Sequence, residues 1–389
     1  MNNTQANNQR LLSLDILRGI TIAGMILVNN PGSWGSVYAP LAHARWNGLT
    51  PTDLVFPFFL FIMGISTYIS LQKYDFQWSG AAAWKIVKRT LVIFAIGLGL
   101  AWLSLFFRTW NSLGREDISF LSRLGQSCWT LDNIRVLGVL QRLALSYGAA
   151  ALIVIAVRHK RIPSLIAALL LLYCCIMLFG NGFEYNESNI LSVVDRYILG
   201  PNHMLRDNGI EPEGILSTIP SIAHLLIGFC CGELLMGTKD INEKIQRLFL
   251  IGTALTFSGF LFGYGCPINK KVWSPTFVLA TCGLACSTLA LLTWVIEVKG
   301  KRRWCKFFES FGANPLLLYV AAAIFSFFMS EIRFSYGDGA MSAQRFVYGK
   351  LLLPLLGNYP ASLVYALLFV LLIWAVGYIF YRKRIYIKI

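Results

Sequence analysis

Long apolar stretches bounded by charged residues recur along the chain. Each is about 20 residues long, the length that an α-helix needs to cross a hydrocarbon core about 30 Å thick. The segment 351–356 either lengthens the last of these helices or forms a short helix at the membrane surface. The pattern predicts an all-α polytopic integral membrane protein, a single transmembrane domain over residues 1–389. We expect about ten crossings, at residues 16–34, 54–72, 87–107, 136–157, 163–180, 218–236, 248–265, 275–297, 311–330 and 360–381.

Composition supports the membrane assignment. Hydrophobic residues make up 56% of the chain and charged residues only 14%, whereas soluble globular proteins carry roughly 25% charged residues. The nine cysteines are scattered, without the paired spacing of a zinc site or of a redox motif. We therefore expect no metal and interpret the cysteines as small apolar residues of the helices.

The distribution of charge predicts the orientation. If the N-terminus is cytoplasmic, the inner segments hold 21 of the 34 lysines and arginines and nearly all of the net charge of +15. Such an excess on the inner side is typical of membrane proteins, so we expect both termini in the cytoplasm and no nucleic-acid partner. The first eighteen residues lack the apolar stretch and cleavage site of a signal peptide. The first helix should therefore remain as an anchor.

Polar residues at the ends of the first helix are the first candidates for function, because such groups are costly near the membrane. Asp15 and Arg18 are three residues apart and can neutralise each other on a helix. Alternatively, Arg18 binds an anionic group of a cytoplasmic donor. Asn29 and Asn30 follow at the outer end.

A second group of polar residues begins the second helix. His43, Trp46 and Asn47 precede Asp53 in the outer loop, and Thr52 or Asp53 can cap the free amides of the helix. A histidine just outside the membrane is suited to proton transfer near neutral pH.

Arg142 lies about two turns inside the fourth helix, next to Gln141. A guanidinium at this depth requires a partner or a polar cavity. Pairing with Asp53 is one possibility, and a polar path through the membrane is the other.

The last candidates precede two further helices on the outer side. Glu213 and Ser217 lie before the sixth helix, and Lys270 and Trp273 lie before the eighth. Helix N-termini offer free N–H groups to anions, although simple capping by Ser217 and Thr218 would also explain these positions.

Seven motifs together resemble a known family. The segments LDILRG, VNN, HARWNGLTPTDLVFPFFLFIMG, GVLQRL, PEGILSTIP, PINKKVWSP and FGANPLLLY occur in the order found in the transmembrane heparan-α-glucosaminide N-acetyltransferase family and its bacterial relatives. The resemblance implies acetyl transfer from cytoplasmic acetyl-CoA to an amino sugar or oligosaccharide on the outer face of a bacterial inner membrane. It implies His43 as the active-site histidine and Asn29 as the nearby asparagine, with Asn30 as the substitute. We expect this protein to lack the animal enzyme's N-terminal luminal domain, and we therefore do not carry over that enzyme's acceptor preference.

Acetyl transfer requires a base for the attacking amine and hydrogen-bond donors for the developing oxyanion. His43 can act as the base or can carry the acetyl group transiently. The alternative is an inner-membrane transporter of amino sugars or related solutes. We leave open a homodimer and expect contacts with membrane lipids. The expected roles are catalysis by His43, Asn29, Asn30 and Asp53, donor binding by Arg18, Gln141 and Arg142, and acceptor binding by Trp46, Asn47, Glu213, Ser217, Lys270 and Trp273.

Overall fold

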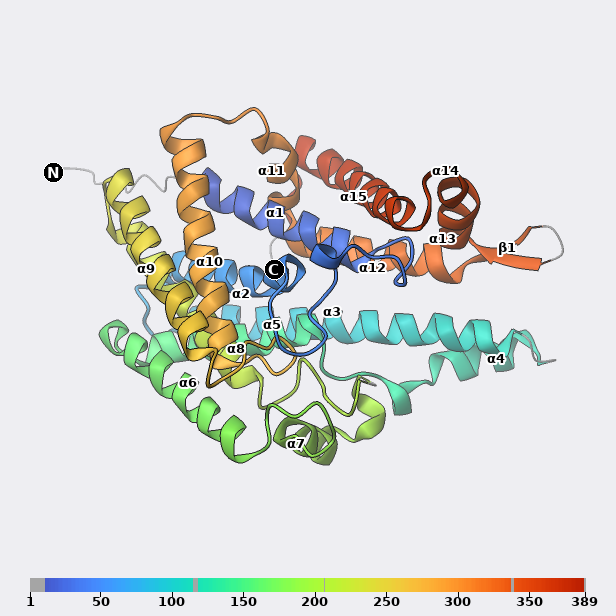
Figure 1. The fold of residues 1–389 in the computed structure, drawn as a ribbon, viewed down its shortest axis with the longest axis horizontal. Helices are drawn as coiled ribbons and strands as arrows, with labels where there is room; N and C mark the ends of the chain where they lie inside the picture. The colour runs from blue at the N-terminus through green and yellow to red at the C-terminus, as the bar shows by residue number, and fades with distance from the viewer. Residues whose placement is uncertain (1–10, 115–117, 206, 337–338, 388–389) are drawn as a thin grey trace.

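The protein is a bundle of long helices with one small β-hairpin (Figure 1). This computed structural model describes residues 11–114, 118–205, 207–336 and 339–387. The two strands pair antiparallel. The elements are α1 (Leu12–Asn29), α2 (Val55–Leu71), α3 (Gly80–Leu113), α4 (Phe120–Cys128), α5 (Val139–Ala156), α6 (Ile162–Phe179), α7 (Ile190–Leu199), α8 (Thr218–Gly237), α9 (Ile241–Phe262), α10 (Pro275–Thr293), α11 (Cys305–Ala313), α12 (Pro315–Glu331), β1 (Arg333–Tyr336), β2 (Gly339–Ser342), α13 (Ala343–Phe346), α14 (Leu353–Leu356) and α15 (Asn358–Arg382).

The helices confirm the predicted membrane architecture. Within the described ranges, nine helices are long and apolar enough to cross a membrane, and the bent pair α11–α12 would make ten. The segment 351–356 does contain a separate short helix, α14. The basic residues Arg10 and Lys388, which contributed to the predicted orientation, lie outside the described residues.

Two predicted helices begin earlier than their apolar stretches. Helix α3 begins at Gly80 instead of residue 87, and Ser79 accepts a hydrogen bond from the Ala82 N–H before its first turn. Helix α9 likewise begins at residue 241 instead of 248, after an Asp240 cap. In both cases the cap, followed by helix-forming charged residues, extends the helix beyond the hydrophobic core. The charged turns of α3 become part of a cavity described below.

The predicted helix at 311–330 is wrong as a continuous element. Helix α11 ends at Ala313, α12 begins at Pro315, and the two axes differ by 86°. Proline disfavours the helical region for the residue before it, and Asn314 indeed has φ −135° and ψ 60°. The chain therefore turns sharply at Asn314.

The centre of the bundle depends on close helix crossings. A Cβ added at Gly64 of α2 would lie 2.1 Å from the Leu225 oxygen of α8, and one at Gly228 would lie 2.2 Å from the Phe61 oxygen. Only glycine permits backbones to approach this closely. Helices α2 and α8 thus form a rigid base from which the loops of the site extend.

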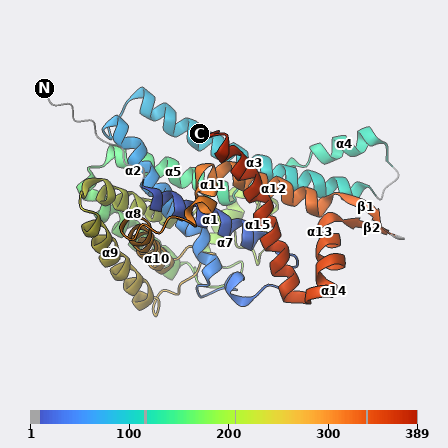
Figure 2. The ribbon, with the colours of Figure 1, turned by 90° about the horizontal axis from the view of Figure 1, so that it is seen from above.

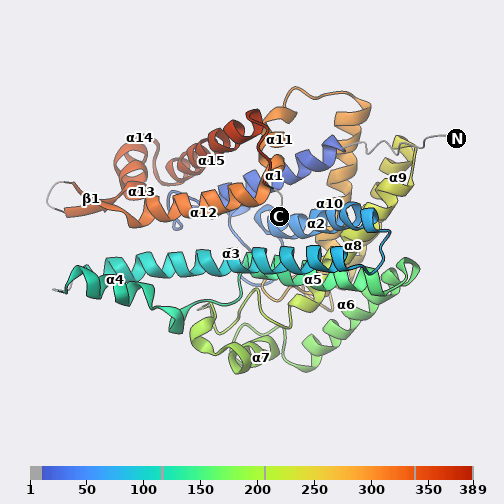
Figure 3. The ribbon, with the colours of Figure 1, turned by 180° about the vertical axis from the view of Figure 1, so that it is seen from behind.

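Helices α3 and α12 run side by side along the long axis of the molecule (Figure 3). At their far ends, the Asn111 side chain donates to the Glu331 backbone oxygen and carboxylate. Helix α4 packs alongside the last turns of α3, and the β-hairpin follows the end of α12 (Figure 2). The space between α3 and α12 contains cavities that bear on function.

Candidate functional site

Three loops meet at the end of the bundle where α1 finishes and α2 begins. The Trp46 indole donates to the Phe183 oxygen over 2.8 Å, and the Gly48 N–H donates to the Ile268 oxygen over 2.8 Å. The Asn269 amide donates to the Asn47 side-chain oxygen over 3.0 Å. Segments that are distant in sequence are thereby joined around His43, and Asn47 serves in this connection.

His43, Asp53 and Lys270 form a compact charged group. The His43 Nδ1 atom lies 2.7 Å from Asp53 Oδ1, and Lys270 Nζ lies 3.0 Å from His43 Nδ1 and 3.5 Å from Asp53 Oδ1. The Asp53 side chain is 1% exposed, whereas that of His43 is 45% exposed. A buried carboxylate therefore holds an accessible imidazole, an arrangement suited to general base or nucleophilic catalysis.

The Nδ1 atom of His43 contacts both Asp53 and Lys270, and the two contacts call for different tautomers. Lys270 can only donate hydrogen bonds and Asp53, when ionised, can only accept them. The shorter contact is with Asp53, so we assign the Nδ1 proton as a donor to Asp53 Oδ1. The Nε2 atom of His43 then carries the free lone pair.

The other oxygen of Asp53 is fixed by the loop itself. Oδ2 accepts from the backbone N–H of Ala44 and of Thr50, each over 3.1 Å, and from the Thr50 hydroxyl over 2.9 Å. Neither predicted residue is the N-cap of α2. Thr50 occupies the N-cap position of the short 3-10 turn Pro51–Leu54 that leads into α2, where Asp53 accepts from the Thr50 N–H, and Thr52 donates to the Pro40 oxygen. Asp53 thus orders both the start of the helix and the imidazole.

His43 opens onto a cavity of about 320 Å³. Burial lowers the pKa of Lys270 below its ordinary value, and the nearby Asp53 carboxylate opposes this effect. Predicted residues Glu213 and Trp273 line the same cavity. Lys270 also lines the cavity, together with Ala44, Asp53, Arg135, Val139, Leu205, Asp207, Pro212 and Lys271.

Arg135 is a site residue that the sequence did not reveal. Its guanidinium pairs with the carboxylates of Glu211 and Glu213. Burial alone would lower the pKa of Arg135, but these two carboxylates raise it above the ordinary value. The partners lie more than 70 residues away in sequence, so no local pattern could have identified the cluster.

A second unpredicted cluster lies at the outer edge of the cavity. The Lys271 ammonium lies 2.7 Å from both the Asp207 carboxylate and the Tyr185 hydroxyl. The Tyr185 hydroxyl also donates to Asp207, and its ring stacks on that of Trp46 with centroids 4.5 Å apart. These hydroxyl, carboxylate, ammonium and aromatic groups are the ones that proteins use to hold polar rings.

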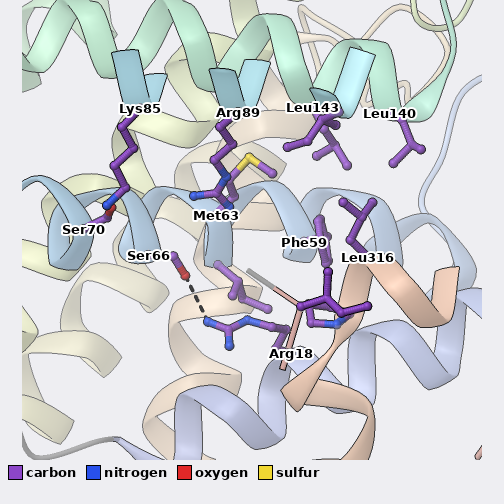
Figure 4. Close-up of a pocket in the computed structure, with 14 residues that line it drawn as sticks. Arg18, Phe59, Met63, Ser66, Ser70, Lys85, Arg89, Leu140, Leu143 and Leu316 are labelled. Atoms are coloured by element: carbon purple, nitrogen blue, oxygen red, sulfur yellow. Dashed lines mark hydrogen bonds between the residues drawn. The ribbon is translucent and has the colours of Figure 1, made fainter. Parts of the chain in front are cut away.

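A basic cavity of about 360 Å³ lies toward the opposite end of the bundle. Arg18, Lys85 and Arg89 point toward it from α1 and α3, with Ser66 and Ser70 of α2 between them (Figure 4). Arg18 pairs with Asp15 over 2.9 Å and donates to Ser66 over 3.0 Å. Arg18 therefore both neutralises Asp15, as the spacing predicted, and lines a cavity.

A third cavity, of about 380 Å³, lies between the basic cavity and the His43 cavity, and we call it the middle cavity. It shares Leu140 with the basic cavity and Arg135, Val139 and Leu205 with the His43 cavity. Gln141 lines it, as predicted. Along α3 the basic cavity and this third cavity together extend from Lys85 to Arg108. This is about 35 Å at 1.5 Å per residue, which is close to the thickness of a hydrocarbon core.

Comparison with known proteins shows which family the chain belongs to. A family model described as heparan-alpha-glucosaminide N-acetyltransferase, catalytic, matches residues 10–264, more than half of the chain. The chain belongs to this family. The human heparan-alpha-glucosaminide N-acetyltransferase is 28% identical over 438 aligned positions, covering 98% of this chain and 60% of the human protein. The mouse protein of the same name is 27% identical over 376 positions, covering 81% of this chain and 54% of its own length. The chain thus spans somewhat over half the length of these relatives.

Two members of the predicted site are placed apart from His43. Asn29 and Asn30 line a small cavity beside Tyr319 and Ser326, and the Asn30 amide donates to the Ile26 oxygen. Neither lines the cavity that contains His43. Their catalytic role in this family member remains a prediction.

Arg142 does not pair with Asp53. Its guanidinium is fully buried, donates to the Ser217 hydroxyl and the Gly214 oxygen, and lies over the Trp273 ring at 5.1 Å. Ser217 makes no side-chain cap for α8. Asp53 instead contacts the loop that carries His43. Arg142 lies against the Trp273 ring, and none of the three cavities has Arg142 in its lining.

Proposed function

We propose that this family member transfers an acetyl group from acetyl-CoA to the amine of an amino sugar, across a bacterial inner membrane. The observation that carries the proposal is the series of adjoining cavities between the three cations Arg18, Lys85 and Arg89 and the imidazole of His43. In this arrangement the donor enters from the cytoplasmic side and the acceptor binds at the outer side.

The basic cavity fits the phosphates of coenzyme A. Guanidinium and ammonium groups bind phosphate oxygens by charge-assisted hydrogen bonds, and Lys85 and Arg89 are four residues apart on one face of α3. The middle cavity combines apolar walls with the Gln141 amide, which suits the alternating methylene and amide groups of a pantetheine arm. The reactive thioester at the end of that arm would then approach His43.

The chemistry at His43 follows from its tautomer. The free Nε2 lone pair takes the proton of the attacking amine while Asp53 stabilises the imidazolium that forms. The amine nitrogen bonds to the thioester carbon and the carbon–sulfur bond breaks. The His43 imidazolium returns the proton to the sulfur, which leaves as a thiol. The Lys270 ammonium can donate to the developing oxyanion. An acetyl-histidine intermediate would use the same Nε2 atom as nucleophile.

The outer clusters are proposed to hold the acceptor. Trp46 and Tyr185 offer aromatic faces, and Asp207 and Lys271 offer hydrogen bonds next to the cavity. Acidic and basic side chains are balanced there, so a neutral or weakly charged sugar ring fits better than a strongly polyanionic chain.

Removing each of two histidines tests the assignment. We expect His43→Ala to lower acetyl transfer at least about a hundredfold, the lower range for loss of a positioned acid-base group. His203→Ala is the matched control, because its Nδ1 contacts only the Ile134 oxygen among the bonds described for it. Loss of transfer in His203→Ala with retention in His43→Ala would overturn the assignment.

Ligand-induced stabilisation separates the enzyme from the transporter. We expect acetyl-CoA to raise the unfolding temperature of the purified protein, because a ligand that binds only the folded state stabilises it. Stabilisation by a free amino sugar, with no effect of acetyl-CoA, would favour a transporter.

A further inference from the structure

The motif FGANPLLLY contributes no residue to the His43 site, yet its asparagine is almost completely buried. Asn314 is 1% exposed and lies at the sharp turn between α11 and α12. Its side chain makes no cap for α12. An amide buried in this way requires partners for both its donor and its acceptor.

Both partners come from the segment 385–387, which follows α15. The Asn314 amide N–H donates to the Ile385 oxygen over 2.8 Å, and the Ile387 N–H donates to the Asn314 side-chain oxygen over 2.9 Å. The side chain thus bridges the backbone of two residues that are two apart in the chain. We call residues 385–387 the C-terminal strap.

The C-terminal strap reaches the basic cavity. Ile387 lines this cavity together with Pro315 and Leu316, the first residues of α12. These three apolar side chains belong to the same cavity as Arg18, Lys85 and Arg89. Asn314 therefore sets the position of one apolar wall by joining the turn to the strap.

We propose that Asn314 is a positioning residue for the donor. It holds the C-terminal strap so that Ile387 and the start of α12 form the apolar wall against which the non-phosphate part of coenzyme A packs. This inference rests on the proposed donor site. The cations alone would bind any phosphate compound, whereas the cations together with this wall select an amphipathic ligand.

The variants Asn314→Ala and Ile387→Pro test the contact from its two sides. The first removes both side-chain hydrogen bonds. The second removes the Ile387 N–H and replaces one side chain of the wall, without altering the turn. Loss of such hydrogen bonds and of the wall they hold should weaken acetyl-CoA binding by about tenfold. Asn358→Ala, at the exposed start of α15, is the control and should bind acetyl-CoA as the wild type does.

The measurements are the equilibrium dissociation constant and KM for acetyl-CoA, kcat, and KM for the acceptor, on the full chain in detergent. We expect both variants to raise the two donor constants while kcat and the acceptor KM change less than about twofold. Because each substitution releases the strap from the turn, the effects should be less than additive. The double variant should bind acetyl-CoA about as well as the single variant that binds it less tightly, which is the signature of coupled sites. If Asn314→Ala does not fold, Ile387→Pro alone decides.

Three results would overturn the inference. Unchanged donor constants in folded variants would exclude the strap from the donor site, and additive effects would exclude a shared contact. A fall in kcat at constant donor KM would point to a purely structural role. Failure of the wild-type protein to bind acetyl-CoA would instead remove the proposed function itself, so the two failures are distinguishable.

Discussion

Replacing Asp53 by asparagine should abolish most of the activity while leaving the loop intact. Asp53 Oδ2 accepts from the N–H groups of Ala44 and Thr50, and these bonds fix how an asparagine can sit. Its oxygen must take the position of Oδ2, so its NH₂ group must face His43 Nδ1. Nδ1 then becomes the acceptor and the ring proton moves to Nε2. The lone pair needed to accept the amine proton is lost.

The expected loss is large because the base itself is removed. Positioned general bases contribute about a hundredfold to ten-thousandfold to rate, or about 3 to 5 kcal/mol of transition-state stabilisation. We expect kcat of Asp53→Asn to fall within this range, with the acetyl-CoA dissociation constant unchanged, because the basic cavity lies at the other end of the bundle.

Steady-state acetyl transfer by purified protein, with unfolding temperatures measured in parallel, provides the assay. Thr52→Val is the matched control, because its hydroxyl donates to the Pro40 oxygen and makes no described bond to His43. A folded Asp53→Asn variant with activity within about tenfold of the wild type would refute the tautomer argument.

Two further predictions concern stability and topology. Burial raises the pKa of Asp195 in α7 from 3.8 to about 6, so ionisation of this group opposes folding and the free energy of unfolding falls as pH rises from about 4 to 6. Relative to the wild type, Asp195→Asn should gain about 3 kcal/mol of unfolding free energy between pH 4 and pH 7. Unfolding measurements that show a pH-independent difference between the two proteins would contradict this. Cysteines introduced at Ala42 and Asn186 in a cysteine-free background should react with an impermeant reagent added outside intact cells, while one at Lys301 should not; labelling at Lys301 alone would reverse the orientation.

The sequence predicted the membrane helices well, because apolar length is a local property. It missed the starts of α3 and α9, where charged residues continue the helix beyond the apolar stretch. It also missed the break at Asn314, although the following proline was visible. Local hydrophobicity cannot distinguish a continuous helix from two helices that meet at an angle.

The site was predicted as a set of residues and not as a set of contacts. His43, Asp53 and Lys270 were each identified, but their mutual distances depend on how three loops pack. Arg135 was missed, because its two carboxylate partners lie in a remote loop. Pairing of Arg142 with Asp53, one of the two possibilities that the sequence left open, was wrong, because Asp53 contacts the loop that carries His43 and Arg142 contacts Gly214 and Ser217.

Transfer across a sealed membrane tests the central claim most directly. Vesicles of known orientation are supplied with acetyl-CoA on one side and an amino-sugar acceptor on the other, and acetylated product is measured. We predict product when acetyl-CoA is on the side of Lys85 and Arg89 and the acceptor is on the side of His43. Product formed only when acetyl-CoA is on the side of His43 would contradict transfer through the series of cavities.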